Sequence, residues 1–548
     1  MTPDGTRWAE GRPPTTGFVG ARNRKGVRRI LRIWLSSADK LGMSKSTPTL
    51  QTDLTADELR ERLAEHERMI AEMLAPYDPV TATMAWFDTL RAIEECINLV
   101  TVDWDDGEEQ LLFGLPVLNV MSWPDHLNAV RSLLAARFSE TFATRFTQLV
   151  IQGASVAMAF DQHDFPRVAA GFVDVSSMIG YLASRRRHFV AMLHALPLFC
   201  RGTERVHPLH SLNNFIPAIE LQGLFLVGAE QALLINAARD RLNIDPAGRL
   251  ALPMLAPLFL EPERSRITEV PLTDEGLKML EAREPLASNR LFSAAELRND
   301  ILAMEATYAE FDLAGTEFSA AATFARRISR EFVDRDFWIA IGPQGLARVS
   351  AEIGLPPALS HALIHTGTSY SDCLSTYAPF VLVDGVYRST VTLLSRFMYH
   401  WRAVTLDGRK RFQIRSGFIF EQAVARELEQ QGFAVQSITR VNRHEFDVVT
   451  VRNGTIWNVQ CKNNFLDLAK LERDPARFAR YNRNLVLSYV RALTKESRRE
   501  QVLKDRLGLR TIEHRVVSRF PVVTDNPRIV PFSMIDHFAN IADRLAGP

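Results

Sequence analysis

Apolar residues recur at helical spacing over most of the first 400 positions. Residues 55–58, Thr-Ala-Asp-Glu, have the form of a capping box, and apolar residues follow every three or four positions until Pro76. The same period returns over residues 85–100, 127–152, 168–196, 221–242, 294–308 and 318–332. No repeat of fixed length links these stretches. The pattern therefore predicts a mostly helical body with short strands at best.

The pattern changes near residue 380. Two apolar runs flank Asp384-Gly385, which is typical of a β-hairpin, and a helix is expected over residues 389–401. Beyond it, residues 416–431 have helical spacing and Gly432 supplies a C-terminal stop. We place the last domain boundary at about residues 405–412, before this helix.

A short strand, a turn and a returning strand are expected after that helix. Residues 434–438 are extended, residues 445–451 alternate as a strand, and residues 455–462 return after the Asn453-Gly454 turn. The chain is thus expected to be multidomain, with a mostly helical N-terminal and middle region and a C-terminal α/β domain.

Charge is distributed unevenly along a chain whose formal net charge is only +1. The last part of the chain is basic, because residues 401–548 hold about 26 Lys and Arg against about 16 Asp and Glu. The domain predicted over residues 405–548 lies within this range. Residues 49–404 are acidic. Residues 1–48 are basic and predicted to be a disordered tail, with Met43 as an alternative start of translation. This asymmetry indicates that one part handles a polyanion, either nucleic acid or an anionic membrane.

The cysteines and the apolar runs bear on the compartment. The 4 cysteines are scattered without a C-x-x-C pair, which fits a reducing cytoplasm. The longest apolar run, residues 223–235, contains Glu230 and Gln231, so no transmembrane helix is expected. We therefore expect a cytoplasmic protein that is not attached to a membrane.

Polar side chains with metal-binding chemistry are concentrated in the second hairpin. Because strand side chains alternate, Gln460 and Lys462 share one face of the returning strand, and Glu445 and Asp447 share one face of the other. Carboxylate, amide oxygen and ammonium groups are the parts needed to hold a hard divalent cation and to orient a water.

The preceding helix adds a further acid. Glu421, Val424 and Leu428 lie at helical spacing on one face, so that Glu421 sits at the edge of an apolar stripe. A carboxylate there is costly unless a cation or a metal lies nearby. Glu421 is therefore a candidate metal ligand or orienting group.

These residues resemble the PD-(D/E)XK, or restriction-endonuclease-like, nuclease superfamily. The likeness rests on residues 417–421, Gly-Phe-Ile-Phe-Glu, on Glu445-Phe446-Asp447, and on residues 459–462, Val-Gln-Cys-Lys. It is closest to the Mrr-like branch, in which Gln replaces the second acid, and it covers about the last 130 residues. The resemblance implies a mixed sheet flanked by helices.

The resemblance also implies roles for individual residues. Asp447 would be the central ligand of a Mg²⁺ or Mn²⁺ ion, with Gln460 in place of the second carboxylate and the Cys461 carbonyl oxygen touching the metal. Lys462 would position the attacking water, and Glu421 matches a helix acid found in many members. The neutral Gln460 removes one negative charge, so metal affinity should fall unless Glu421 or Glu445 compensates.

The implied function is a metal-dependent DNA endonuclease, by analogy a defence or restriction-type enzyme with a helical sensor or oligomerisation region. RNA is not excluded as substrate, and a homo-oligomer is compatible with the sequence. An arginine-rich segment follows the hairpin and is expected to hold nucleic acid through Arg473, Arg477, Arg480 and Arg483.

Three other interpretations stay open. The chain could be a nuclease-like protein that binds nucleic acid without cutting it. It could be an interaction protein whose basic end lies on a membrane surface. Finally, the hairpin could be an ordinary one in which Asp447 and Lys462 form an exposed ion pair.

Overall fold

The structure is a computed structural model of the whole chain. It describes residues 54–162, 166–244, 270, 272–441, 443–464, 471, 473–520 and 522–546. The predicted disordered tail, residues 1–48, and the alternative start at Met43 lie outside the described residues.

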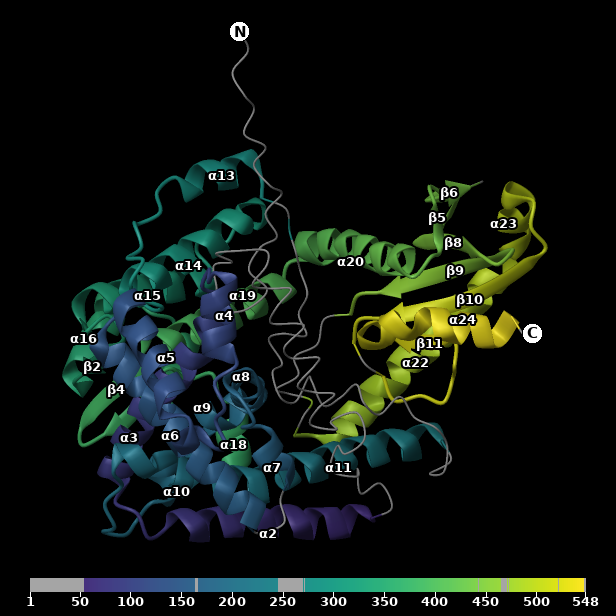
Figure 1. Cartoon of the computed structure of the whole chain (residues 1–548). Coiled ribbons are helices and arrows are strands. Elements are labelled where there is room, and N and C mark those ends of the chain that lie inside the picture. The colour runs from purple at the N-terminus through teal and green to yellow at the C-terminus, as the bar shows by residue number, and fades with distance from the viewer. Residues whose placement is uncertain are drawn as a thin grey trace.

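Most of the chain before residue 408 is helical, as the apolar periodicity predicts (Figure 1). Thr55 and Glu58 form the expected capping box at the start of the first described helix. The helices of this body are α2 (Ala56–Leu74), α3 (Pro79–Asn98), α4 (Asp106–Phe113), α5 (Pro124–Arg137), α6 (Glu140–Gln162), α7 (Pro166–Ala170), α8 (Val175–Ser184), α9 (Arg186–Phe199), α10 (Ser211–Ala218), α11 (Leu224–Leu242), α13 (Asp274–Leu280), α14 (Ala294–Thr307), α15 (Glu317–Glu331), α16 (Pro343–Ile353), α17 (Pro357–Ala362), α18 (Tyr370–Ser375) and α19 (Val391–Asp407).

Two stretches predicted as single helices are divided. Residues 127–152 break at Phe138, which leaves helical geometry between α5 and α6. Residues 168–196 break twice, where Asp174 caps α8 and again at Arg185 before α9. Apolar periodicity continues across these breaks because both halves pack on the same core, so the period alone does not reveal them.

A small antiparallel sheet completes the body. Its strands are β1 (Val333–Asp334), β2 (Trp338–Ile341), β3 (Val381–Val383) and β4 (Val386–Thr390), in the order β1-β2-β4-β3. The predicted Asp384-Gly385 hairpin joins β3 to β4, and both turn residues have positive φ. This is the geometry that favours Gly and Asp at a two-residue turn.

The C-terminal region is a mixed five-stranded sheet flanked by helices, so the predicted fold class is confirmed (Figure 1). The strand order is β11-β10-β9-β8-β5, with β5 (Ala434–Gln436), β8 (Val448–Arg452), β9 (Thr455–Lys462), β10 (Thr511–Ser518) and β11 (Ile529–Pro531). The strands β5, β8 and β9 pair antiparallel, whereas β9, β10 and β11 run parallel. The Asn453-Gly454 turn joins β8 to β9 as predicted.

Helices cover both faces of this sheet. On one face, α20 (Lys410–Gln430) and α24 (Phe538–Ala546) enclose a core around Trp457 and Val459. On the other face lie α22 (Pro475–Arg498) and α23 (Glu500–Leu507), with Val449 and Ile456 beneath α23. The apolar residues of the hairpin formed by β8 and β9 are therefore buried on both sides of the sheet.

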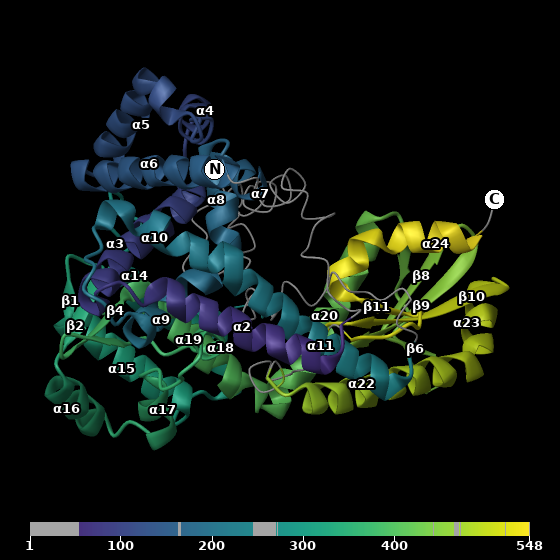
Figure 2. The ribbon, with the colours of Figure 1, turned by 90° about the horizontal axis from the view of Figure 1, so that it is seen from below.

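The body and the C-terminal region meet along α22. Helix α11 packs between α2 and α22, and Figure 2 shows these helices running side by side toward the sheet. Buried residues of α22, among them Phe478 and Leu485, belong to the same hydrophobic cluster as the body. Helix α19 ends at Asp407 and α20 begins at Lys410, and the domain boundary at residues 405–412 stays a prediction.

One helical stretch in the described part of the chain, Pro208–Leu242, is long and apolar enough to cross a membrane. Two thirds of its apolar window, 67%, is buried inside the protein, where it packs against α2 and α22. Burial of this kind is typical of a core helix, and the structure is compatible with a soluble protein.

Candidate active site

The pairing of β8 with β9 brings three of the predicted site residues together. Val448 pairs with Val459, so the next step of the register places Asp447 opposite Gln460. Asp447 Oδ2 accepts a hydrogen bond of 2.7 Å from the backbone N–H of Cys461. Lys462 Nζ donates to Gln460 Oε1 at 3.4 Å, which confirms that these two side chains share a face. The three groups therefore converge at one end of the hairpin.

Glu421 reaches the same place from α20. Val424 and Leu428, on the same helix face, are completely buried and fix the orientation of the helix against the sheet. Burial, and after it the negative charge of Asp447, raise the pKa of Glu421 to about 7, while the charge of Lys462 acts in the opposite direction. Because α20 packs against β8 and β9, Glu421 lies within electrostatic range of Asp447 and Lys462, and it faces the end of the hairpin where the other three groups meet.

Opposing effects act on the pKa of Asp447. Burial raises its pKa, while the Cys461 N–H and Lys462 lower it, and the Glu496 charge raises it again. The hydrogen bond occupies one of its two carboxylate oxygens. Among the described residues, no ion pair within 4.0 Å joins Asp447 to Lys462, so the exposed ion pair of an ordinary hairpin is not what the structure shows there.

Gln460 is buried, with only 7% of its surface exposed. Its Oε1 faces the Lys462 ammonium, whereas its Nε2 has no hydrogen-bond partner among the described residues. A buried amide N–H without a partner costs about 1–3 kcal/mol. Because the ammonium can only donate, the oxygen must face it, which fixes the orientation of the amide.

The donor set fits a hard divalent cation by chemistry. Two carboxylates, the Gln460 Oε1 atom and the Cys461 carbonyl are all oxygen donors, the type that Mg²⁺ and Mn²⁺ prefer. The described residues contain no group of three or more His, Cys, Asp or Glu side chains that could hold a metal ion. Burial raises the pKa of the Cys461 thiol well above its usual value, so this residue offers its backbone and not a thiolate.

Glu445 does not belong to the cluster, contrary to the expected strand. Glu445 ends the short strand β7 (His444–Glu445), which pairs with β6 (Arg440–Val441), and the chain bends at Asp447 before β8 begins. Glu445 and Asp447 therefore do not share a strand face. Glu421, and not Glu445, is the acid that accompanies Asp447.

Several polar residues behind the site were not singled out from the sequence. Asn458 Nδ2 donates to Glu496 Oε2 at 2.8 Å, and Arg499 Nε donates to the same oxygen at 2.9 Å. Arg499 also donates to the Glu445 carbonyl at 2.7 Å. Glu496 lies in the last turn of α22 and Arg499, three positions later, is its C-cap residue, a spacing that allows an ion pair. Their burial could not be read from the sequence.

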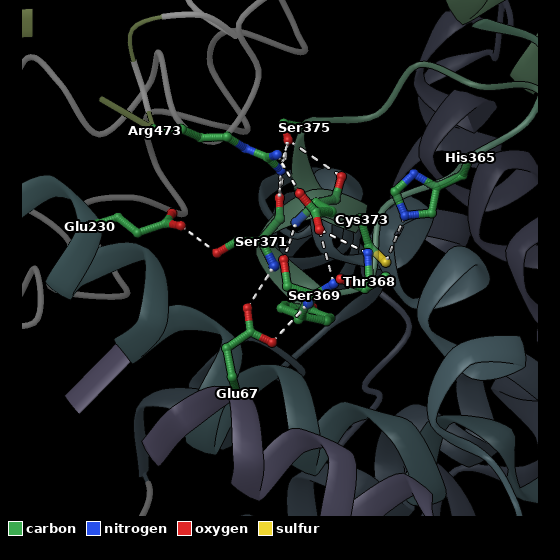
Figure 3. A network of polar contacts seen from close by, with 11 residues as sticks. Glu67, Glu230, His365, Thr368, Ser369, Ser371, Cys373, Ser375 and Arg473 are labelled. Carbon is green, nitrogen blue, oxygen red and sulfur yellow. Dashed lines mark hydrogen bonds and ion pairs between the residues drawn. The ribbon is translucent and has the colours of Figure 1, made fainter. Parts of the chain in front are cut away.

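Arg473 does not lie on the arginine-rich helix. Helix α22 begins at Pro475 with Asp474 as its cap. The Arg473 guanidinium instead forms an ion pair with Asp372 and donates to the Ser371 carbonyl at 2.6 Å and to the Ser375 hydroxyl (Figure 3). Arg473 thus ties the C-terminal region to α18 of the body.

The contact made by Arg473 belongs to a larger polar junction, shown in Figure 3. Glu67 of α2 accepts hydrogen bonds from the Tyr370 and Ser371 backbone N–H groups at 2.8 and 2.9 Å. The Ser371 hydroxyl donates to Glu230 of α11. The start of α18 is therefore held by three other segments of the chain, one of which carries Arg473.

The other predicted nucleic-acid contacts are exposed on α22. Arg477, Arg480 and Arg483 all point into solvent, and Arg477 and Arg480 line an open hollow of about 480 Å³ together with Asp474, Tyr481 and Asn484. These three arginines remain available to bind a ligand.

Comparison of the chain with protein-family models, with curated proteins and with solved structures finds no match.

Proposed function

We propose that this chain is a metal-dependent endonuclease that hydrolyses phosphodiester bonds of DNA. The observation that carries the proposal is the convergence of Glu421, Asp447, Gln460 and Lys462 at one end of the hairpin. These are the residues through which the sequence resembles the PD-(D/E)XK nucleases, and they come together from a helix and a hairpin that are separate in the sequence.

Each residue has a definable part in such a reaction. Asp447, Glu421 and the Gln460 oxygen would hold Mg²⁺ or Mn²⁺, with the Cys461 carbonyl as a fourth donor. The metal would supply polarisation of the phosphate and a lowered pKa of a bound water. Lys462 keeps its ammonium next to Gln460 and can donate to a water or a phosphate oxygen. Glu421, with its pKa raised to about 7, can hold or release a proton near neutral pH.

DNA is the proposed substrate because the acidic site needs a partner that brings phosphates against its negative charge. The exposed arginines of α22 supply the opposite charge, and RNA is the competing polyanion. A cytoplasmic location fits the four free cysteines, all of which the structure describes. The helical body would serve as a sensor or an oligomerisation region, as in defence-type nucleases.

The test is nicking of supercoiled plasmid DNA by the purified chain with Mg²⁺ or Mn²⁺. Asp447→Ala and Lys462→Ala should each abolish nicking, because one removes a metal ligand and the other the ammonium that orients the water. Glu445→Ala is the matched control, since this exposed acid lies two residues away outside the cluster. Nicking that survives both site variants contradicts the proposal.

Gln460 favours a second candidate, a protein that binds nucleic acid without cutting it. A neutral, buried amide takes the place of an acid, leaving two carboxylates for a divalent ion. Salt-sensitive DNA binding with no cleavage by the wild-type chain, whichever metal is present, supports this candidate. Cleavage that appears only in Gln460→Glu would show a site weakened by that one missing charge.

A further inference from the structure

Helix α22 carries five cations along one side of its solvent face, two near its start and three near its end. At 100° per residue, the members of the row lie within about 60° of one another, and the buried side chains Phe478 and Tyr489 lie on the opposite side. We name this row the α22 stripe; its members are Arg477, Arg480, Arg491, Lys495 and Arg498, with the amide of Asn484 between them.

The cations of the stripe are unpaired in the part of the chain that the structure describes. No ion pair or side-chain hydrogen bond engages any of the five, in contrast to Arg452, Arg499 and Arg515 of the same region, each of which pairs with a carboxylate. The stripe therefore offers five cations that no described carboxylate neutralises.

An ordinary solvated helix face mixes charges of both signs at neighbouring turns. Within its 24 residues, α22 contains a single acid, Glu496, which is buried and bound to Arg499 and Asn458. The exposed surface of this helix thus has no carboxylate, although Asp474 lies at its cap. Selection for solubility alone does not account for such a surface, whereas an anionic partner does.

The length of the stripe limits the shape of that partner. From Arg477 to Arg498 a helix rises about 32 Å at roughly 1.5 Å per residue. One turn of a DNA duplex is about 34–36 Å long. At the start of the stripe, Arg477 and Arg480 frame the hollow that also contains Asp474, Tyr481 and Asn484. The Asp474 carboxylate is engaged by the Arg477 backbone N–H, and a phosphate in the hollow can approach two guanidinium groups and an amide.

We infer that the α22 stripe docks the sugar-phosphate backbone of a DNA duplex over about one helical turn. The choice of DNA as the polyanion rests on the proposed function. Of the four arginines predicted from the sequence to hold nucleic acid, Arg473 is excluded because it pairs with α18, and Arg483 is excluded because it lies about a quarter turn away from the stripe. Arg491, Lys495 and Arg498 join Arg477 and Arg480 in the docking surface.

The stripe is separate from the candidate active site. Tyr489, on the buried side of α22, accepts a hydrogen bond of 2.6 Å from Asn464, which lies two residues after Lys462. The thickness of the helix, about 10 Å, therefore lies between the stripe and the end of β9. Loss of the stripe should weaken binding and raise KM while leaving kcat of any nicking unchanged.

The test compares two triple variants of the full chain. One is Arg477→Gln with Arg491→Gln and Arg498→Gln, in the stripe. The matched control is Arg60→Gln with Arg68→Gln and Arg348→Gln, which removes the same charge from exposed arginines of the body. Fluorescence anisotropy with a labelled duplex of about 30 base pairs, in EDTA, measures the affinity of each at several salt concentrations.

The stripe variant should bind the duplex at least ~10-fold more weakly at about 0.1 M salt. Its plot of log K against log salt should flatten by up to about 2.7, or roughly 0.9 for each phosphate that the variant no longer neutralises. The control should keep the wild-type slope. An unchanged slope in the stripe variant, no duplex binding by the wild type, or tighter binding to RNA or to phosphatidylserine vesicles overturns the inference. Duplex binding without nicking contradicts only the proposed function.

Discussion

Replacing Glu421 by Gln should stabilise the metal-free protein at alkaline pH while abolishing the proposed nicking of DNA. Glu421 is half-buried beside Asp447, and its pKa is raised to about 7 by burial and then by the charge of Asp447. The free energy of unfolding of the wild type therefore falls as pH rises from about 4.5, the ordinary value, through about 7. Gln cannot ionise, so the variant does not undergo this loss.

The size of the effect follows from the two pKa values. A difference between 4.5 and about 7 corresponds to about 3 kcal/mol for a fully enclosed carboxyl, at roughly 1.4 kcal/mol per tenfold change. Because Glu421 is partly exposed, solvent screening reduces this to about 1–2 kcal/mol. The variant should match the wild type at about pH 5 and exceed it by that amount at about pH 8.

Urea denaturation in EDTA buffers, followed by tryptophan fluorescence, measures this difference across the pH range. Glu429→Gln, an exposed acid on the same helix, controls for the change in net charge. Mg²⁺ should restore the stability of the wild type at about pH 8 and not that of the Glu421 variant. A difference between variant and wild type that stays flat with pH would refute the placement of Glu421 beside Asp447.

Three further outcomes follow from the same contacts. Gln460→Glu should tighten Mn²⁺ binding by at least ~10-fold in calorimetric titration, because a new carboxylate faces the metal site; unchanged affinity would place the metal elsewhere. Arg473→Ala should lower the free energy of unfolding by about 1–2 kcal/mol and speed hydrogen exchange in α18. The control Arg477→Ala should change the free energy of unfolding by less than about 0.5 kcal/mol. Equal effects of the two variants would contradict the junction of Figure 3. Gly454→Ala should lower the free energy of unfolding by about 1 kcal/mol because the φ of Gly454 is 73°. Gly417→Ala should raise it by up to about 1 kcal/mol, because Gly417 lies inside α20 with open space around it. Thermal unfolding that reverses these signs would contradict the turn.

The local parts of the site could be predicted from the sequence because short-range rules determine them. The Asn453-Gly454 turn sets the register of the hairpin, and the register sets which residues face each other. The position of Glu421 follows from its spacing to Val424 and Leu428. Each of these steps depends on residues at most 14 positions apart.

The rest depends on contacts between distant segments. Nothing near Arg473 in sequence shows that its partner is Asp372, 101 positions earlier. Similarly, the burial of Glu496 and Arg499 is set by the sheet beneath them. The sequence also does not reveal the bend at Asp447, because the alternating pattern of apolar and polar residues is the same across a bend as along a continuous strand.

The arrangement of charges suggests why the second acid can be dispensable at this site. Asp447 and Lys462 balance each other, so the ionisation state of Glu421 decides whether the metal-free cluster is neutral or negative. With a third acid, two like charges would have to be buried without compensation before a metal arrives. The neutral Gln460 avoids one of these two buried charges, and protonation of Glu421 avoids the other. If the proposed divalent cation binds here, it has to displace this proton, so the affinity for Mg²⁺ or Mn²⁺ should increase with pH up to about 7.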